Sequence, residues 1–194
     1  MKSIAVFCGS SEGNLPIYSE QAAQVGTYLA KQGIRLVYGG GKNGLMGVVA
    51  NAALQAGGEV LGVIPHFMAP KEVAHKGLSQ LLWVDSMHER KQKMFEISDG
   101  FIAMPGGFGT LDELFEIVTW AQLGLHRYPI GLLNVQGYFN PLLQFADQIV
   151  AHGFTSAATR SCVLHAEEID ALIQIMKAYQ YPEGSQWLKH TDQT

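Results

Sequence analysis

The chain has 194 residues, of which 47% are hydrophobic and 15% charged, and its formal net charge is −4. This length and composition support one domain with a substantial core, and the negative charge gives no basic surface for nucleic acid. No apolar run reaches the roughly 18 to 20 residues of a membrane helix, and the first run breaks at Gly9, before a signal-peptide core could form. We therefore expect a cytoplasmic protein that binds neither nucleic acid nor membranes.

Short apolar runs alternate with helical patterns along the chain. Runs rich in β-branched or aromatic residues and bounded by Gly, Pro or Asn predict strands at Ile4–Cys8, Arg35–Tyr38, Glu59–Ile64, Leu81–Val84, Phe101–Met104, Ile130–Leu133 and Cys162–His165. Helical periodicity predicts helices at Pro16–Lys31, Leu45–Ala56, Met87–Ser98, Thr110–Leu123, Tyr138–His152 and Glu167–Tyr179. The alternation predicts an α/β fold, a Rossmann-like, doubly wound and mainly parallel sheet of about seven strands flanked by helices.

The chain shows no internal repeat and no interdomain linker, which predicts a single Rossmann-like domain over residues 1–181. The remaining residues, 182–194, are mostly polar and predict a flexible C-terminal tail.

Three glycine-rich loops follow predicted strands, at residues 9–11, 39–44 and 105–110. Ligands of doubly wound sheets bind outside the carboxyl ends of the strands, so these loops are expected to line one rim. The second loop also matches G-x-G-x-x-G through Gly39, Gly41 and Gly44, which raises the alternative of a dinucleotide site with Glu59 as ribose ligand. That match is weak, because the loop follows the second strand and Glu59 begins a strand instead of ending one.

The loop at 105–110 runs straight from a strand into a helix, and this arrangement predicts an anion site. Glycines let backbone amides approach an anion, and the unpaired amides and dipole of a helix start favour negative charge. Asp112 and Glu113 are expected in the same first turn, which suggests acid chemistry beside a phosphate. The ordinary alternative is that the helix dipole alone favours these carboxylates. Along the same helix, Leu111, Leu114, Phe115 and Val118 form the predicted core face, and Glu113, Glu116 and Trp120 lie on another.

Arg90 is the second informative residue. Helical spacing puts it on one stripe with Met87 and Met94, an apolar setting in which a charge needs a partner. It is either part of a solvated basic face with Lys91 and Lys93 or a fork for phosphate or carboxylate.

The cysteines and histidines give no sign of metal chemistry. Cys8 and Cys162 lie in predicted strands, where buried thiols are the common case. The seven histidines have no metal-binding spacing, so we expect no metal and no cofactor.

The paired motifs Met87-x-x-Arg90-Lys91 and Pro105-Gly-Gly-x-Gly-Thr-x-x-Glu113 resemble the signature of the Lonely Guy (LOG) family. These proteins are cytokinin riboside 5′-monophosphate phosphoribohydrolases and are often mislabelled lysine decarboxylases. The resemblance covers nearly the whole chain. It implies a Rossmann-like fold without a dinucleotide, a homodimer with sites at the interface, and hydrolysis of a nucleoside 5′-monophosphate to free base and ribose 5-phosphate.

The resemblance also implies site residues. Arg90 and Glu113 would be the catalytic pair, although the sequence leaves open how they divide the work. The residues expected to bind the substrate and its phosphate are Gly9, Ser10, Gly40, Gly41, Glu72, Lys91, Gly106, Gly107, Phe108, Gly109, Thr110, Leu111, Asp112 and Thr119.

Several alternatives stay open. The scaffold could serve a non-catalytic nucleotide-binding regulator, and the preferred base could be adenine or an N6-prenylated adenine. A pyridoxal-dependent decarboxylase is disfavoured, because the lysines at 42, 71, 76, 91 and 93 lie in polar loops or charge runs. Trp120, Leu123 and Leu125 either meet a second subunit or complete the core.

Overall fold

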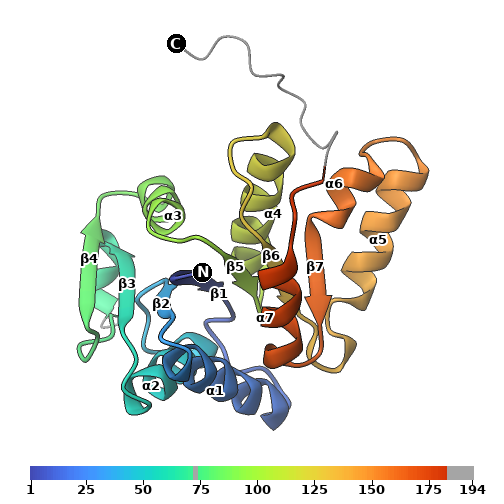
Figure 1. Cartoon of the computed structure of the whole chain (residues 1–194). Helices are drawn as coiled ribbons and strands as arrows, with labels where there is room; N and C mark the ends of the chain where they lie inside the picture. Colours follow the sequence, from blue (N-terminus) through green and yellow to red (C-terminus); the bar gives the residue numbers. More distant parts are fainter. Residues whose placement is uncertain (72–73, 183–194) are drawn as a thin grey trace.

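A computed structural model describes residues 1–71 and 74–182 of the chain (Figure 1). Its centre is one sheet of seven parallel strands in the order β4-β3-β2-β1-β5-β6-β7. The strands are β1 (Ser3–Phe7), β2 (Arg35–Tyr38), β3 (Val60–Pro65), β4 (Gln80–Val84), β5 (Phe101–Ala103), β6 (Ile130–Leu133) and β7 (Val163–Ala166). The predicted α/β sheet is therefore confirmed, and it is parallel throughout.

Helices connect the strands. They are α1 (Pro16–Lys31), α2 (Gly44–Gln55), α3 (Met87–Glu96), α4 (Phe108–Leu123), α5 (Asn140–Ala151), α6 (Ala157–Ser161) and α7 (Ile169–Ala178), with short 3-10 helices η1 (His66–Lys71) and η2 (Val135–Gly137). Every predicted strand and helix is present, with ends within two residues of the prediction.

The short helix α6 was not predicted from the sequence. Ser156 caps it by accepting a hydrogen bond from the Thr159 backbone amide at 3.0 Å. Cys162 follows this helix and is not in a strand, because β7 begins at Val163. Five helical residues are too few to show a helical period against the apolar strand that follows.

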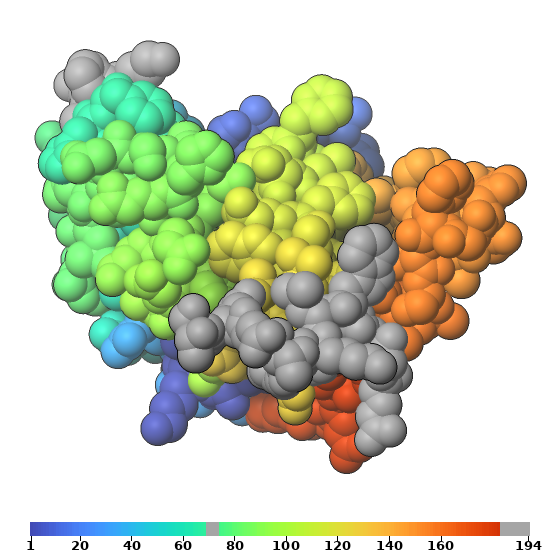
Figure 2. Space-filling model, turned by 90° about the horizontal axis from the view of Figure 1, so that it is seen from above, coloured from blue at the N-terminus to red at the C-terminus, as the bar shows by residue number. Residues whose placement is uncertain are grey.

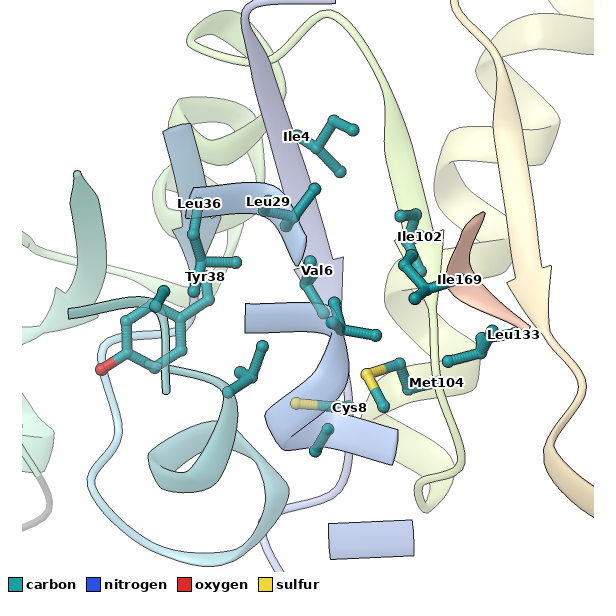
Figure 3. Close-up of a cluster of buried hydrophobic side chains, with 14 of the residues drawn as sticks. Ile4, Val6, Cys8, Leu29, Leu36, Tyr38, Ile102, Met104, Leu133 and Ile169 are labelled. Carbon is teal, nitrogen blue, oxygen red and sulfur yellow. The ribbon is translucent and has the colours of Figure 1, made fainter. Parts of the chain in front are cut away.

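Strand side chains alternate between two apolar layers, as the period of a strand requires. On one face, residues such as Ile4, Val6 and Leu36 pack with Leu29 of α1, and this layer also contains α2 and α7 (Figure 3). On the other face, Phe7 and its neighbours pack with residues of α3, α4 and α5. Both faces are covered, which explains the nearly continuous apolar runs of the strands.

The order of the strands reverses at β1. The chain builds outward from β1 to β4 on one side, then returns to pair β5 with β1 and builds outward to β7 on the other side. The loops that leave β1 and β5 therefore diverge at a topological switch point, where sheets of this kind bind ligands.

None of the helices in the described ranges is long and apolar enough to cross a membrane. Of the predicted tail, all but Pro182 lies outside the described residues.

Candidate functional site

The structure brings the three glycine-rich loops together at the switch point. The Gly9 amide donates to the Pro105 carbonyl at 3.1 Å, which joins the loops after β1 and β5. The Met46 amide donates to the Gly9 carbonyl at 3.4 Å, and a Cβ on Gly44 would overlap the backbone of Ser10. At Gly9, Gly44 and Gly106 a Cβ would lie within 3 Å of neighbouring atoms, and this accounts for glycine at these three positions.

The start of α4 leaves several backbone amides unpaired. Gly107 is its N-cap, in extended conformation, and no side chain caps the helix. The first helical bond runs from the Leu111 amide to the Gly107 carbonyl at 3.2 Å. The amides of Phe108, Gly109 and Thr110 thus have no partner within the helix, as an anion site at a helix start requires.

The carboxylates lie farther along this helix than predicted. Helix α4 begins at Phe108, so Asp112 and Glu113 fall in its second turn, and its first turn has no acidic residue. The prediction of a shared first turn was wrong, because Gly109 adopts ordinary helical geometry and allows the helix to start two residues early. The first turn, which carries the unpaired amides, thus has no carboxylate of its own.

Arg90 and Glu113 form a buried ion pair between α3 and α4. Arg90 Nη1 lies 3.2 Å from Glu113 Oε1, and the two side chains are 10% and 11% exposed. Arg90 Nε donates to the carbonyl of Val63 in β3 at 3.1 Å. The prediction that Arg90 faces inward with Met94 is confirmed, whereas the alternative of a solvated arginine is wrong.

The position of the Arg90 guanidinium depends on a glycine. A Cβ on Gly39 would overlap Nη2 of Arg90, so the loop after β2 closes on the guanidinium only because residue 39 has no side chain. The start of α3 is also fixed, since Ser86 accepts from the Glu89 amide at 3.1 Å and Glu89 Oε2 accepts from the Asp85 amide at 2.7 Å. These reciprocal bonds resemble a capping box and set which residues of α3 face the sheet.

Lys91 joins α3 to α4 on the outer side of the buried pair. Its Nζ lies 3.1 Å from Asp112 Oδ2 and 3.2 Å from Glu116 Oε1. Burial would lower the pKa of Lys91, but its hydrogen bonds to the two carboxylates outweigh this effect and raise that pKa. A Schiff-base lysine needs the opposite shift, so the environment of Lys91 does not suit a pyridoxal-dependent reaction.

The acid at the centre of the site has an unusual environment. Burial raises the pKa of Glu113, Asp112 and Glu116 raise it further, and Arg90 and Lys91 oppose the increase. Cys8 lies nearby, and burial together with the charge of Glu113 raises the pKa of its thiol despite the opposing Arg90. As predicted, Cys8 and Cys162 are buried, free thiols.

A hollow of about 300 Å³ opens between the loops after β1 and β5. Tyr18, Leu45 and Tyr138 contribute to its lining, together with residues 9–13 and 105–107. A larger hollow of about 430 Å³, which includes Arg35 and Glu59, lies at the amino ends of the strands. The smaller hollow is the better candidate, because ligands of such sheets bind at the carboxyl ends.

Several predicted residues lie elsewhere. Glu59 forms an ion pair with Arg35 at 3.0 Å at the amino edge, so the dinucleotide alternative with Glu59 as ribose ligand was wrong. Thr119 lies nine residues after Thr110, about 14 Å along α4, and its hydroxyl donates to the Phe115 carbonyl at 2.7 Å. Glu72 lies outside the described residues. Gly40 has φ +71° and its carbonyl accepts from the His75 amide, while Gly41 forms a bridge to Ala74.

The predicted faces of α4 need one correction. Phe115, assigned to the core, is 45% exposed, whereas Glu113 is buried at 9%. Trp120 completes the core by contacting the Phe95 ring edge-on at 4.9 Å, while Leu125 is 48% exposed. The loop that contains Gly39 was predicted to line the rim, but the contact of Gly39 with Arg90 was not predicted, nor was the contact of Tyr138 with the loop after β5. Both contacts join segments that are distant in sequence and leave no local pattern.

Known proteins of one family match most of this chain. A family model described as "Possible lysine decarboxylase" matches residues 46–176. Cytokinin riboside 5′-monophosphate phosphoribohydrolase LOG7 of Arabidopsis thaliana is 48% identical over 179 residues, which cover 92% of this chain and 82% of that protein. The phosphoribohydrolase LOG of Oryza sativa subsp. japonica is 43% identical over 188 residues, covering 96% of this chain and 78% of the relative.

Solved structures with lower identity share the fold. A molybdenum cofactor binding protein from Rippkaea orientalis superposes with a TM-score of 0.69 at 21% identity, covering 91% of this chain and 95% of that one. The Moco carrier protein of Chlamydomonas reinhardtii gives 0.67 at 19% identity, with 91% and 95% covered. At these identities the likeness extends to the fold alone.

Proposed function

The chain belongs to the family of cytokinin riboside 5′-monophosphate phosphoribohydrolases, and from this membership we propose that Arg90 and Glu113 catalyse the reaction. The activity is hydrolysis of the N-glycosidic bond of a nucleoside 5′-monophosphate, which gives a free base and ribose 5-phosphate. The observation that supports these residues best is the buried ion pair beside an uncapped helix start.

Glu113 is suited to work on the sugar. Cleavage of a glycosidic bond passes through an oxocarbenium-like state, which a nearby carboxylate stabilises while it positions or deprotonates water. Arg90 Nη1 approaches Glu113 at Oε1, at 3.2 Å. We assign Oε2 to the sugar or the attacking water.

Arg90 orients the acid. Its Nη1 pairs with Glu113 and its Nε with the Val63 carbonyl, so two of its donors are committed to the protein. This geometry favours positioning and charge compensation of Glu113 over anchoring of the substrate, the two roles that the sequence left open. Without Arg90, burial would drive Glu113 toward its neutral form, which stabilises an oxocarbenium ion less well.

The 5′-phosphate is assigned to the start of α4. Three amides without helical partners, at residues 108–110, converge there with the positive end of the helix dipole. Gly106 adjoins Thr110, and Gly9 adjoins Pro105 and Gly106 from the loop after β1. We assign Gly9, Ser10 and Gly106 to the same phosphate site. A nucleoside that lacks the phosphate is therefore expected to be a poor substrate.

We propose that the protein is a homodimer in which α4 faces the second subunit. Thr119 and Phe115 lie on an exposed side of α4, too far along the helix to meet a phosphate at its start within one subunit. Phe108, at 92% exposure, and Met87, at 38%, add apolar surface on α4 and α3. Figure 2 shows these two helices, α3 in green and α4 in yellow, on one face of the molecule. A second copy would cover this surface and bring Thr119 toward a site.

The reaction is tested by chromatographic detection of free base after incubation with AMP and, separately, with N6-isopentenyl-AMP. We expect the wild type to release base, and Glu113→Gln and Arg90→Ala to lose about 1,000-fold in kcat/KM while staying folded. Glu96→Gln, which changes an exposed acid of α3, is the matched control. Turnover at the wild-type rate by Glu113→Gln would refute the assignment, and nucleotide binding without base release would indicate a regulator instead.

A further inference from the structure

Tyr138 contacts the proposed phosphate loop from a distant part of the chain. Its hydroxyl donates to the carbonyl of Gly106 at 2.6 Å, across 32 positions of sequence. The ring of Tyr18 meets Tyr138 edge-on at 6.0 Å, and both tyrosines line the hollow between the loops after β1 and β5. The contact is short for a hydrogen bond between a hydroxyl and a carbonyl.

The turn that carries Tyr138 is built with local strain. Gln136 has φ 49°, and it is the one positive-φ residue other than glycine in the described part of the chain; Gly137 follows with φ +72°. Asn134 holds this turn in place. Its side-chain Oδ1 accepts a hydrogen bond from the Phe139 backbone amide at 2.7 Å, and its backbone amide donates to the Ala166 carbonyl at 2.8 Å. A non-glycine residue in this region costs of order 1 kcal/mol or more and is commonly found at functional sites.

The adjacent ring fixes the direction of Tyr138. Phe139 is buried at 1% exposure and meets the Tyr138 ring at right angles, with 5.0 Å between centroids. The Tyr138 hydroxyl is therefore directed at the Gly106 carbonyl by three features: the end of β6, the strained turn and the buried Phe139.

The consequence for the loop follows from the planar peptide bond. In a trans peptide the carbonyl of one residue and the amide N–H of the next point in opposite directions. Because the Tyr138 hydroxyl holds the Gly106 carbonyl toward Tyr138, the Gly107 amide must point away from Tyr138. The Gly9 amide holds the Pro105 carbonyl at 3.1 Å in the same way, and this sets the direction of the Gly106 amide.

We propose that Tyr138 is a positioning residue for the phosphate-binding loop, which it holds with the Gly107 amide directed at the anion. The inference rests on the proposed function, since the anion is the 5′-phosphate of the nucleotide. Gly106 packs closely against Thr110, since a Cβ at residue 106 would overlap Thr110 Oγ1. Loss of the hydroxyl should therefore free one peptide unit of the loop and leave the Arg90–Glu113 pair in place.

The test is Tyr138→Phe, which removes only the hydroxyl. Calorimetry with ribose 5-phosphate should show affinity weakened by about 3- to 10-fold, the range expected for one hydrogen bond. The KM for AMP should rise by a similar factor while kcat changes by less than about 2-fold, and kcat/KM for adenosine should not change. Tyr28→Phe is the matched control, because it removes a hydroxyl bond of 2.9 Å to Asp170.

The outcomes separate this inference from the proposed function. Equal affinity of wild type and Tyr138→Phe for ribose 5-phosphate would overturn the role of Tyr138, as would an equal loss of kcat/KM for AMP and adenosine. Failure of the wild type to bind ribose 5-phosphate would overturn it as well. A wild type that binds ribose 5-phosphate and releases no base would refute the proposed reaction, while the comparison of affinities would still test Tyr138.

Discussion

Arg90 and Glu113 meet at 3.2 Å from different helices, and each side chain keeps only about a tenth of its surface in contact with solvent. A buried pair of this kind is sensitive to the loss of either partner, because the remaining charge is left without compensation. The ion pair also depends on neighbouring residues, which can be substituted while Arg90 and Glu113 are kept.

Gly39→Ala tests the seat of Arg90. The new Cβ would overlap Arg90 Nη2 and displace the guanidinium from Glu113. We expect kcat/KM to fall by about 100-fold or more with the fold retained, measured by base release and by circular dichroism. Gly33→Ala is the control, since it has φ +65° and no neighbour within 4 Å, and it should cost about 1 kcal/mol of stability without loss of activity. Full activity of Gly39→Ala would show that the guanidinium does not need this position.

Two substitutions should move the pH dependence in opposite directions. The proposed mechanism requires an ionised Glu113, so activity should decline as the pH falls through the raised pKa of this residue. Asp112→Asn removes a charge that raises this pKa and should shift the acid limb of kcat/KM to lower pH. Lys91→Met removes a charge that lowers the pKa and should shift the limb to higher pH.

The measurement is kcat/KM for AMP across the acid range, with Asp147→Asn as control. Asp147 pairs with Arg160 at 2.8 Å, away from the site. Shifts in the same direction for Asp112→Asn and Lys91→Met would show that Glu113 is not the group that titrates.

His126 should contribute to the pH dependence of stability. It is 5% exposed, its Nε2 donates to the Ile117 carbonyl at 2.8 Å, and its Nδ1 accepts from the Tyr128 amide at 3.2 Å. Burial lowers its pKa, although the bond to Ile117 opposes this, so the unfolded state binds the proton more readily. Its contribution is thus complete above the unfolded pKa and is lost as the pH falls toward the lowered folded pKa.

His126→Phe provides the measurement. The ring contacts with Phe95 and Phe101 can persist, but two backbone groups lose their partner, so we expect a loss of about 2 to 4 kcal/mol at pH 7.5 by urea denaturation. The difference in unfolding free energy between wild type and variant should be smaller at about pH 5.5. At that pH protonation of His126 in the unfolded state destabilises the wild type, and the variant lacks this group. A constant difference at both pH values would assign the acid sensitivity to other groups.

Phe115→Glu tests the proposed dimer. A carboxylate in place of a 45% exposed ring on α4 should weaken an apolar contact between subunits and shift the mass in light scattering from dimer to monomer. Phe145→Glu, on α5, changes a ring that is 58% exposed and should leave the mass unchanged. Dissociation by Phe145→Glu alone would place the contact on α5.

The fold followed from the sequence because each element carries its own signal. Strands β2 and β6 and helix α1 have the predicted ends, since Gly, Pro or Asn residues bound them. The first turn of α4 was misplaced because glycine spacing does not reveal whether Gly109 is helical. Phe115 was assigned to the core because one sequence cannot distinguish a residue that faces its own core from one that faces solvent or a partner.

The site was predictable in its motif residues and not in their support. The apolar stripe that contains Arg90 indicated a buried arginine, and the glycines of the 105–110 loop indicated an anion site. The contacts of Gly39 with Arg90 and of Tyr138 with Gly106 could not be found in this way, because they join segments that are distant in sequence. Such pairings become visible only when the order of the strands is known.

The position of the ion pair also links its formation to the folding of the sheet. Arg90 comes before β5 and is braced on β3, whereas Glu113 comes after β5, so the pair exists only once β5 has docked beside β1. A molecule in which β5 has not docked thus carries both side chains without the assembled pair. Under the proposed assignment, hydrolytic competence is acquired only when the central sheet is complete.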